Sequence, residues 1–404
     1  MNHKNHSSDN IPKLRFPEFS DSWEVKKLGD IILKLSSGVS VNSIDEPIKE
    51  TGEYGILKTS CISSGKFYPT QNKKIVPNEV SKAKLNPLAD TILISRMNTP
   101  QLVGESGYID NDYPNLFIPD RLWMTEIGIQ NNAKFLSILL SSSNMMEKIS
   151  NIASGTSGSM KNISKPNFLD IECTFPTLPE QQKIATFLST VDEKLQALKK
   201  KKSLLEIYKK GVMQKLFSQE RNAARIRFKD DEGDDFEDWE VRKLGEISEK
   251  KSSNISANKI EDNFGEYIIY GASGILKKVD FYKEENDYVS IIKDGAGVGR
   301  IVYCKGKSSV LGTMEMIKSR IELNTYFLYC LLENIDFTKY ITGSTIPHIY
   351  FKDYKNEICE IPCIEEQTKI SNFLMAIDEK INNVDAQIKQ TELWKKGLLQ
   401  QMFV

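Results

Sequence analysis

The sequence predicts an α+β fold arranged as a pseudo-two-fold internal repeat: two similar mixed α/β domains, each followed by one long helix. Three observations predict it. A long helical pattern occurs twice, a short charged segment that leads into each domain occurs twice, and the stretches between them differ in sequence but share an order of expected strands and helices. Self-similarity at a fixed offset is typical of a duplicated structural unit.

The longest helical pattern runs from Pro179 to Phe217 and recurs from Glu365 to Phe403. FPTLPEQQKIATFLSTVDEKL (175–195) aligns without a gap with IPCIEEQTKISNFLMAIDEKI (361–381), and the same offset aligns YKKGVMQKLF with WKKGLLQQMF. At about 1.5 Å per residue, each helix would be a rod of about 57 Å. One such helix would often be an ordinary core helix, but its duplication favours a pair of spacer helices that bury their apolar stripes on each other.

Apolar residues recur in each copy with a mainly seven-residue rhythm, as the seam of a coiled coil requires. The expected seam positions are Ile184, Leu188, Val191, Leu195, Leu198, Leu205, Val212 and Leu216 in the first helix, and Ile370, Leu374, Ile377, Ile381, Val384, Ile388, Leu398 and Met402 in the second. Each stripe is interrupted twice, by Lys202 and Lys209 and by Thr391 and Lys395. We expect Leu204, Tyr208 and Trp394 to fill these less regular stretches.

Composition indicates a soluble globular protein. The 404 residues are 40% hydrophobic and 27% charged, which excludes disordered and fibrous classes. No apolar run approaches a membrane span and the start has no hydrophobic signal region, so we expect a cytoplasmic protein. The six cysteines form no CxxC pair and there are three histidines, so no metal site is expected. Cys173 and Cys359 fall at equivalent repeat positions and are expected to fill apolar sites.

The leading segment reads WEVKKLG from Trp23 and WEVRKLG from Trp239. It divides the chain into consecutive segments. We expect an N-terminal segment (1–22), a first domain (23–176), a central long helix (177–220), an acidic linker (221–238), a second domain (239–362) and a C-terminal long helix (363–404). The two domain bodies are unlike in sequence, and the first is the longer.

Each body reads as short strands followed by a helix. Strands are predicted over 55–62 and 90–97 in the first body and over 266–274 and 287–303 in the second, with helices over 133–142 and 324–335. A stretch rich in glycine, serine and threonine then precedes each long helix, at 154–163 and 342–349. Such residues let a backbone approach a phosphate closely, although each stretch alone is also consistent with a plain flexible loop.

No catalytic motif is complete in this sequence. DGAGVGR (294–300) places glycines at alternate positions and continues into a strand, whereas a dinucleotide site needs GxGxxG opening a helix. A tight hairpin with its tip facing a ligand is the better interpretation. The GxxxxGK[ST] loop, HExxH, paired cysteines and GxSxG are absent. The Asn/Asp-Pro-Pro-aromatic signature of amino-methyltransferases is absent as well, so we expect a non-catalytic chain.

The repeated leading segment, the unlike bodies of similar layout and the two PEQQKIATFLSTVDEK-type helices together resemble the specificity subunit of type I restriction-modification systems. The resemblance covers nearly the whole chain. It implies two target recognition domains, each reading one half of a bipartite, asymmetric DNA site, and two conserved helices paired as an antiparallel coiled coil that sets the gap between the half-sites. It also implies two methylation subunits, which modify adenine with S-adenosylmethionine, and motor-nuclease subunits, which use ATP and Mg²⁺.

The DNA-contacting residues predicted in this sequence follow from strand ends, hairpin tips and small-residue loops. They are Lys58, Arg96, Asn98, Ser157, Lys161 and Asn162 in the first body, and Ser273, Lys293, Asp294, Arg300, Thr345 and His348 in the second. Arginine can bond guanine and asparagine can bond adenine bidentately, whereas residues of the small-residue loops would contact phosphate or base in a positional role. Ordinary surface charge on hairpins is the alternative for each residue.

Net charge does not by itself indicate a nucleic-acid partner. The formal charge is −1, whereas nonspecific DNA affinity comes mainly from neutralised phosphates. A near-neutral chain is compatible with DNA binding if partner subunits supply much of the phosphate contact. The competing interpretation is a non-catalytic coiled-coil scaffold with two protein-binding domains, which would show no salt-dependent DNA binding.

Overall fold

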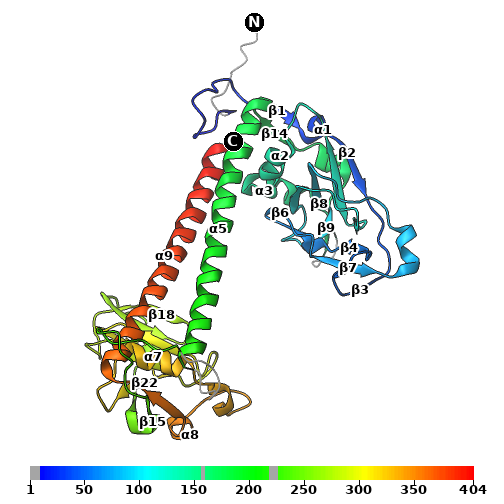
Figure 1. Ribbon diagram of the computed structural model, residues 1–404. Helices are drawn as coiled ribbons and strands as arrows, with labels where there is room; N and C mark the ends of the chain where they lie inside the picture. Colours follow the sequence, from blue (N-terminus) through cyan, green and yellow to red (C-terminus); the bar gives the residue numbers. More distant parts are fainter. Residues whose placement is uncertain (1–9, 156–159, 218–225) are drawn as a thin grey trace. The chain divides into compact units, whose positions relative to one another are not determined.

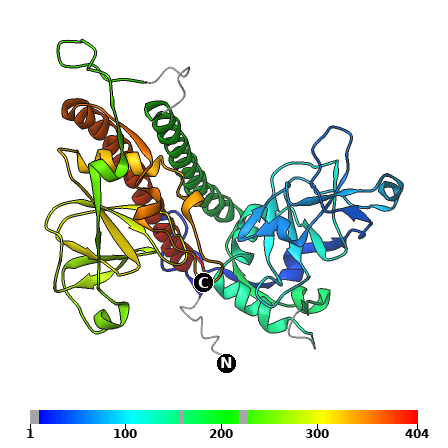
Figure 2. The ribbon, with the colours of Figure 1, turned by 90° about the horizontal axis from the view of Figure 1, so that it is seen from below.

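The computed structural model describes residues 10–155, 160–217 and 226–404. The chain forms two compact units, each built from segments that are distant in sequence. Unit 1 comprises Met1–Gln196 and Lys389–Val404, and unit 2 comprises Ala197–Ile388. The two long helices belong partly to both units, and each runs unbroken through its length (Figure 1 and Figure 2).

Unit 1 holds the first body and parts of both long helices. Its strands are β1 (Glu24–Lys27), β2 (Ile32–Ser37), β3 (Ser43–Ile44), β4 (Gly55–Leu57), β5 (Ile62–Ser63), β6 (Gly65–Phe67), β7 (Asn72–Ile75), β8 (Thr91–Ser95), β9 (Met97–Asn98), β10 (Ser106–Ile109), β11 (Leu116–Phe117), β12 (Leu122–Ile127), β13 (Lys161–Asn162) and β14 (Glu172–Phe175). Its helices are α1 (Leu28–Ile31), α2 (Ala133–Leu140), α3 (Ser143–Ile152), α4 (Lys165–Leu169) and the start of α5 (Leu178–Leu216), with 3-10 turns η2 (Thr59–Cys61) and η3 (Pro77–Lys82).

Unit 2 repeats this order with fewer strands. Its strands are β15 (Glu240–Lys243), β16 (Ser248–Ser252), β17 (Tyr267–Gly271), β18 (Gly274–Val279), β19 (Tyr288–Ile292), β20 (Ile301–Cys304), β21 (Ser308–Val310), β22 (Met314–Ser319) and β23 (Ile358–Ile361). Its helices are α6 (Leu244–Ile247), α7 (Thr325–Glu333), α8 (Phe351–Tyr354) and the start of α9 (Ile364–Met402), with 3-10 turns η4 (Ala257–Ile260) and η5 (Phe337–Tyr340).

The main sheets of the two bodies follow one plan. The order β2-β12-β8-β10 in unit 1 corresponds to β16-β22-β19-β20 in unit 2, and unit 1 extends its sheet with β6 and β5. A second sheet follows the same rule, with β11-β4-β7-β3 in unit 1 and β21-β17-β18 in unit 2. Strands β5, β6 and β3 therefore account for extra structure in the longer first body. The sequence prediction of two similar mixed α/β domains is confirmed.

One predicted strand is shorter than expected. The strand predicted over 55–62 ends at Leu57, because Cys61 donates its backbone N–H to the carbonyl of Lys58 and closes the 3-10 turn η2. This turn carries Cys61 into the core, where it is fully buried. The alternation of side chains expected of one continuous strand is thereby lost.

The repeated leading segment pairs with the strand that precedes each long helix. β1 runs antiparallel to β14, with Glu24 opposite Phe175, and β15 runs antiparallel to β23, with Glu240 opposite Ile361. Burial of Trp23 and Trp239 in the two cores secures the segments. The WEV-K/R-KLG repeat therefore forms a short two-stranded ladder that ties the start of each domain to its end.

Cys173 and Cys359 lie in β14 and β23, at equivalent positions of this ladder. Both thiols are buried, and burial raises the pKa of each to about 12. The cysteines therefore remain neutral at physiological pH and pack as apolar side chains, as the sequence predicts.

The long helices pack against each other in both units, and the pairing is antiparallel. In unit 1 the first half of α5 meets the last turns of α9, where the rings of Phe187 and Trp394 lie 6.0 Å apart. In unit 2 the last turns of α5, with Val212 and Leu216, share a core with Ile370 and Leu374 near the start of α9. All the expected seam residues are buried or half-buried, the half-buried ones being Leu198, Leu205 and Ile381.

The lysines that interrupt the apolar stripes lie within the helix pair and form ion pairs across it. Lys395 Nζ is 2.6 Å from Asp192 Oδ1 in unit 1. In unit 2, Lys202 and Lys209 make contacts of the same length with Asp385 and Asp378. Moving seven residues forward on α5, from Lys202 to Lys209, moves the partner seven residues back on α9, as one antiparallel register requires.

The expectation that Leu204 and Tyr208 fill the interrupted stretches is wrong. Their exposed fractions are 56% and 53%, because the lysine–aspartate pairs already occupy the seam at this level. Trp394 does contact Phe187, although about half of its surface stays in solvent. Large apolar side chains therefore face outward on the helices.

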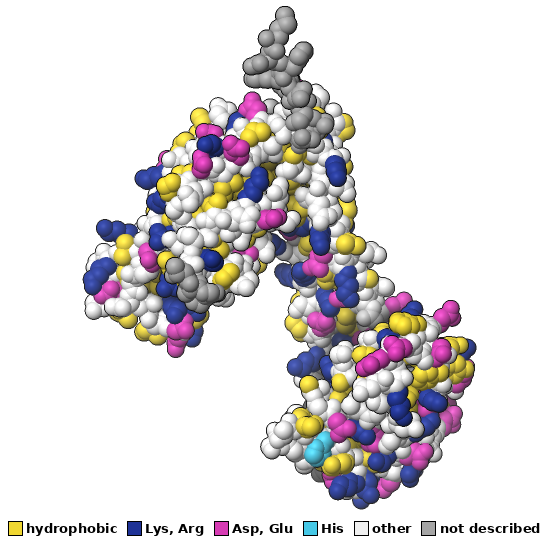
Figure 3. Space-filling model, turned by 180° about the vertical axis from the view of Figure 1, so that it is seen from behind, with side chains coloured by type: hydrophobic (Ala, Val, Ile, Leu, Met, Phe, Trp, Pro, Cys, Tyr) yellow, Lys and Arg dark blue, Asp and Glu magenta, His cyan; other side chains and the backbone are white. Residues whose placement is uncertain are grey.

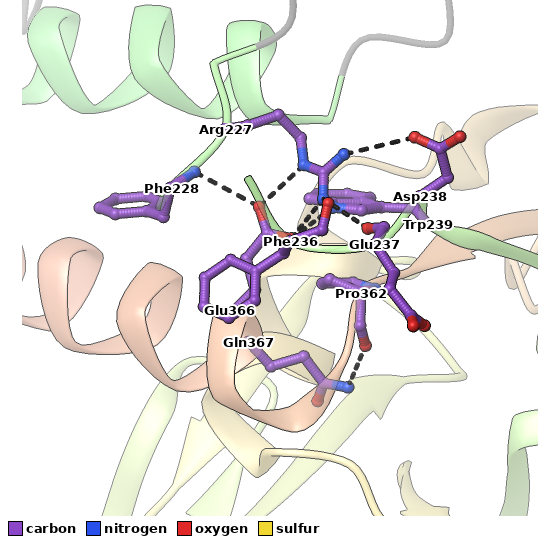
Figure 4. A network of polar contacts seen from close by, with 9 residues as sticks. All are labelled: Arg227, Phe228, Phe236, Glu237, Asp238, Trp239, Pro362, Glu366 and Gln367. Carbon is purple, nitrogen blue, oxygen red and sulfur yellow. Dashed lines mark hydrogen bonds and ion pairs between the residues drawn. The ribbon is translucent and has the colours of Figure 1, made fainter. Parts of the chain in front are cut away.

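A buried carboxylate at the start of α9 holds the leading segment of unit 2 (Figure 4). Glu366 is fully buried and accepts hydrogen bonds from Arg227 Nε at 3.0 Å and Nη2 at 2.9 Å. It also accepts from Trp239 Nε1 at 2.9 Å. The hydrogen bond to this carboxylate raises the pKa of the Arg227 guanidinium. The adjacent Gln367 donates to the carbonyl of Pro362 at 2.9 Å, which fixes the turn into the helix.

Unit 1 contains the same arrangement. Arg15 donates to both oxygens of Glu180 at 2.7 and 2.8 Å, and Trp23 Nε1 donates at 3.3 Å. Gln181 donates to the carbonyl of Pro176 at 2.9 Å. The Glu-Gln pair of the PEQQ and EEQT motifs is therefore a structural anchor, and its duplication confirms the internal repeat down to individual hydrogen bonds.

Charge is distributed without a dominant sign on the face drawn in Figure 3, where basic and acidic side chains are interspersed. Among the described helices none combines the length and apolarity needed to cross a membrane. On the face drawn in Figure 3, strong attraction for a polyanion would have to come from local groups of side chains.

Candidate nucleic-acid interface

The predicted residues of the first body meet where β8 ends. Arg96 follows β8, and its backbone N–H donates to the carbonyl of Arg121 at 3.1 Å. Its own carbonyl accepts the backbone N–H of Ile163 at 2.9 Å. In the adjoining β9–β13 ladder Asn98 stands opposite Lys161, and Asn162 follows. We define Arg96, Asn98, Arg121, Lys161 and Asn162 as the unit 1 junction.

Unit 2 has the same junction where β19 ends. Lys293 donates its backbone N–H to the carbonyl of Thr313 at 3.0 Å and accepts that of Ile349 at 3.0 Å. The neighbouring Asp294 forms a bridge with His348. We define Lys293, Asp294, Thr313 and His348, together with Arg300, as the unit 2 junction.

Equivalent backbone bonds identify which residues correspond. Ser95 bonds to the backbone of Gly104 and Glu105, just as Ile292 bonds to that of Gly299 and Arg300. The two junctions therefore have one backbone frame. On this frame Arg96 corresponds to Lys293, Arg121 to Thr313, Asn162 to His348 and Glu105 to Arg300. The frame is repeated, and most of the side chains on it are chemically different.

The glycine-rich segment of unit 2 forms the predicted hairpin, because β19 and β20 pair antiparallel with Ile291 opposite Ile301. Gly295, Gly297 and Gly299 have φ values of 83°, 84° and 85°, a left-handed conformation that side-chain-bearing residues avoid. The Arg300 guanidinium donates to the carbonyl of Ala272, which brings the β17–β18 turn against the hairpin tip. Ser273 is the exposed residue of that turn.

The small-residue loop of unit 2 closes through mutual backbone bonds between Thr342 and His348, of 2.9 and 2.8 Å. Thr345 is exposed within this loop, and the imidazole of His348 lies 4.9 Å from the ring of Tyr350. Gly295 donates to the carbonyl of Pro347 at 2.9 Å, so the loop and the hairpin tip are joined. Five of the six predicted residues of unit 2 therefore lie in or beside one junction, and Thr345 extends from it.

One predicted residue of unit 1, Lys58, stands apart from this grouping. Lys58 lies at the end of β4 in the second sheet, where its ammonium group is 2.9 Å from Asp45. This ion pair favours the ordinary structural interpretation of Lys58. Ser157 lies outside the described residues.

Arg121 is the junction residue that the sequence prediction missed. It is exposed and directly precedes β12, between the turn residue Asp120 and the buried Leu122. Its position at a strand end was the available signal, since the same criterion selected Arg96. The residue is recognised only once β12 is known to lie beside β8.

The electrostatic environments of the junctions differ. In unit 2, Lys293 Nζ lies 4.0 Å from Asp294 Oδ2. In unit 1, across the described part of the chain, neither the Arg96 nor the Arg121 guanidinium has a hydrogen bond or ion pair, and Arg96 Nε and Asn162 Oδ1 are buried without a partner. No group of three or more potential metal ligands occurs among the described residues. The junctions present hydrogen-bonding and charged groups and suit recognition of a polar surface.

Comparisons with known proteins identify similar chains. The family model described as "Type I restriction modification DNA specificity domain" matches residues 20–207 and 236–392. The chain is 25% identical to the type I restriction enzyme MjaVIII specificity subunit of Methanocaldococcus jannaschii, over 96% of this chain and 92% of that protein. It is 24% identical to the putative MjaX specificity subunit of the same organism, over 98% and 96%.

Solved structures agree in fold. The crystal structure of a type I restriction-modification S subunit from M. genitalium superposes with a TM-score of 0.68 at 20% identity, covering 98% of this chain and 99% of that one. A chain from a structural study of assembly and conformational transition in a type I R-M system gives a TM-score of 0.51 at 14% identity, with 94% and 97% covered. These similarities extend over both units and both long helices.

Proposed function

This chain belongs to the family of type I restriction-modification DNA specificity subunits, and from this premise we propose that each of its units reads one half of a bipartite, asymmetric DNA site. The family is non-catalytic, so the chain selects the DNA on which partner subunits act. The observation that carries the proposal is the repeated junction. One backbone frame with unlike side chains provides two related reading surfaces with different chemical preferences.

Within each junction we assign side chains according to their chemistry. Asn98 and Asn162 in unit 1, and Arg300 and His348 in unit 2, are suited to base edges in the major groove. Lys161, Lys293, Ser273 and Thr345 are suited to phosphate oxygens, and we keep Lys58 and Ser157 as weaker candidates for the same role. Asp294 can accept a hydrogen bond from a cytosine amino group.

We further propose that two methylation subunits bind the outer faces of the long helices, one at each copy of the KKG motif. In unit 2, Ile207 and Tyr208 are 64% and 53% exposed. Their equivalents in unit 1, Leu393 and Trp394, are 72% and 48% exposed. A pair of exposed large apolar residues at matching positions of both copies fits a partner that binds twice in the same way.

The glycine of each KKG motif strengthens this assignment. Gly211 and Gly397 lie inside the helices, where glycine lowers helix stability relative to alanine by about 1 kcal/mol. A Cβ atom placed at either glycine would meet nothing within 4 Å. Packing inside this chain therefore does not require the glycines, whereas close approach of a partner helix would.

Substitution of the exposed apolar residues tests this surface. We expect Ile207→Glu or Leu393→Glu to leave one methylation subunit bound instead of two, and the double variant to bind none. Native mass spectrometry of the co-purified complex measures the stoichiometry. Ile129→Glu makes the same change at an isoleucine that is 91% exposed and lies outside both long helices, and it is the matched control. Two bound subunits in the double variant would refute the assignment.

The partners would supply the chemistry. S-adenosylmethionine would be held by the methylation subunits, and ATP and Mg²⁺ by motor-nuclease subunits, all in the cytoplasm where the DNA is accessible. Single-molecule methylome sequencing of a host with and without this chain tests the function. We expect a bipartite methyl-adenine motif that disappears when the chain is deleted. An unchanged methylome, together with DNA binding that does not depend on salt, would support the scaffold alternative instead.

A further inference from the structure

We propose that Arg121 is the residue that reads a guanine in the half-site recognised by unit 1, beside a sequence-independent DNA contact from Arg96. The inference rests on the proposed function and specifies what one junction recognises. It starts from the strand register: Leu122 of β12 stands opposite Ser95 of β8. Continuing this register by one residue beyond the strand ends pairs Arg121 with Arg96, and a 3.1 Å hydrogen bond from the Arg96 N–H to the Arg121 carbonyl joins their backbones.

Two arginines that stand directly opposite each other on adjacent antiparallel strands present their side chains on the same face, with Cβ atoms about 5 Å apart. Like charges at such positions repel each other and destabilise the folded chain. Among the described residues no carboxylate forms an ion pair with either guanidinium, and the buried Nε of Arg96 has no acceptor. The two arginines therefore lack compensation in the described part of the chain, and a ligand with acceptor atoms would provide it.

Comparison of the two junctions distinguishes a residue that would contact DNA of any sequence from a residue that would recognise a particular base. Arg96 corresponds to Lys293, so a cation occupies this position in both units, as expected for a contact that does not depend on sequence. Arg121 corresponds to Thr313, so here the two units differ completely in charge and reach. A residue that makes two half-sites different must itself differ between the units, and Arg121 meets this condition.

The chemistry of the guanidinium selects the base. Arginine presents its N–H donors in a planar fork, and guanine offers O6 and N7 as paired acceptors in the major groove. Adenine and cytosine place an amino donor at this edge, and thymine offers one acceptor beside a methyl group. The exposed Arg121 guanidinium therefore favours a G·C pair in the unit 1 half-site.

The experiment uses the complete chain in complex with its methylation subunits, on duplexes that carry the motif found by methylome sequencing. Each guanine of the unit 1 half-site is replaced in turn by 7-deazaguanine, which lacks the N7 acceptor. We expect one replacement to weaken binding by wild type by about 5- to 150-fold, the range for a bidentate arginine–guanine contact. Arg121→Thr should bind the unmodified duplex correspondingly more weakly and show no further loss with that replacement.

Two further variants make the outcome decisive. Arg121→Lys keeps the charge without the fork, so it should accept other bases at the same position while retaining most of its affinity. Arg242→Lys alters a partly exposed arginine of unit 2 that is paired with Glu240 and should leave the motif unchanged. Arg121→Thr should melt no lower than wild type, since it removes a repulsion and installs the residue that unit 2 carries.

The proposal is overturned if Arg121→Thr keeps the wild-type methylated motif, if it weakens binding to all sequences equally, or if it alters the other half-site. These results differ from failure of the proposed function, in which the wild-type chain itself would direct no bipartite methylation.

Discussion

Replacing Glu366 with alanine tests how the leading segment of unit 2 is held to α9. The Glu366 carboxylate is fully buried and accepts hydrogen bonds from Arg227, from Trp239 Nε1 and from the backbone N–H of Phe228. Alanine removes the acceptor for all of these groups. The Arg227 side chain, which is only 25% exposed, would then lack its carboxylate partner.

The geometry around Glu366 determines the expected decrease in the free energy of unfolding. Loss of one partner of a buried ion pair destabilises a protein by about 3–5 kcal/mol, because the other charge remains buried. Since Arg227 keeps some contact with solvent and still donates to the carbonyls of Phe236 and Glu237, we expect the lower end, about 3 kcal/mol. Glu366→Gln keeps the shape and one acceptor and should cost about half as much, on the order of 1.5 kcal/mol.

Hydrogen exchange measured by mass spectrometry can assign this loss to one unit. If opening of the β15–β23 ladder becomes easier by about 3 kcal/mol, its amides should exchange roughly 100-fold faster. The equivalent β1–β14 ladder of unit 1, which depends on Glu180 instead, is the internal control. Glu379→Ala, an exposed change on the same helix, should have an effect within about 0.5 kcal/mol.

Less than a threefold change in the exchange of β15 and β23 would refute the anchoring role of Glu366. Equal acceleration in both ladders would also refute it, since the carboxylate would then be stabilising the whole chain instead of one leading segment. The mirror variant Glu180→Ala should reverse the pattern, accelerating β1 and β14 only.

Three further predictions concern recognition, and methylome sequencing measures each. Arg300→Ala or His348→Ala should relax one or more positions of the unit 2 half-site and leave the unit 1 half-site intact, with each lost contact worth about 1–3 kcal/mol; unchanged motifs would contradict the assignment. Exchange of residues 23–176 for those of a related protein should alter one half-site and keep the gap, so a changed gap would argue against separate reading domains. Insertion of four residues after Lys199 lengthens α5 by about 6 Å and should widen the gap by at most two base pairs without altering either half-site, whereas altered half-sites would place the helices in the reading surface.

Much of the fold follows from local sequence. The two long helices were predicted to within one residue at each end, because an apolar rhythm sustained over many turns specifies a helix that must bury one face. Duplication of the leading segment likewise predicted that the chain folds as two related units. The prediction that Tyr208 fills the seam failed because a tertiary contact replaced the local pattern. The Lys209–Asp378 ion pair occupies the seam at this level, and Tyr208 is exposed.

Less of the candidate interface than of the fold could be predicted from the sequence. Glycines at 295, 297 and 299 predict a tight turn because only glycine adopts their left-handed conformation easily. Proximity of Ala272 or Pro347 to that turn depends on how separate strands and loops meet, and no spacing in the sequence encodes it. For the same reason Lys58 and Arg96 look alike in sequence, although Lys58 is paired with Asp45 and Arg96 is unpaired among the described residues.

The sequence by itself determined that this protein has two related units and two seam-forming helices, because repetition and periodicity are local properties of the chain. Tertiary structure alone decided that the backbone of Arg96 bonds to that of Arg121 while the backbone of Lys293 bonds to that of Thr313. Strand pairing joins residues far apart in sequence, and the register of β8 with β12, or of β19 with β22, sets which side chains meet. The physical reason is that each residue type has its own side-chain chemistry, whereas the surface that recognises DNA forms only after strands that are distant in sequence have paired.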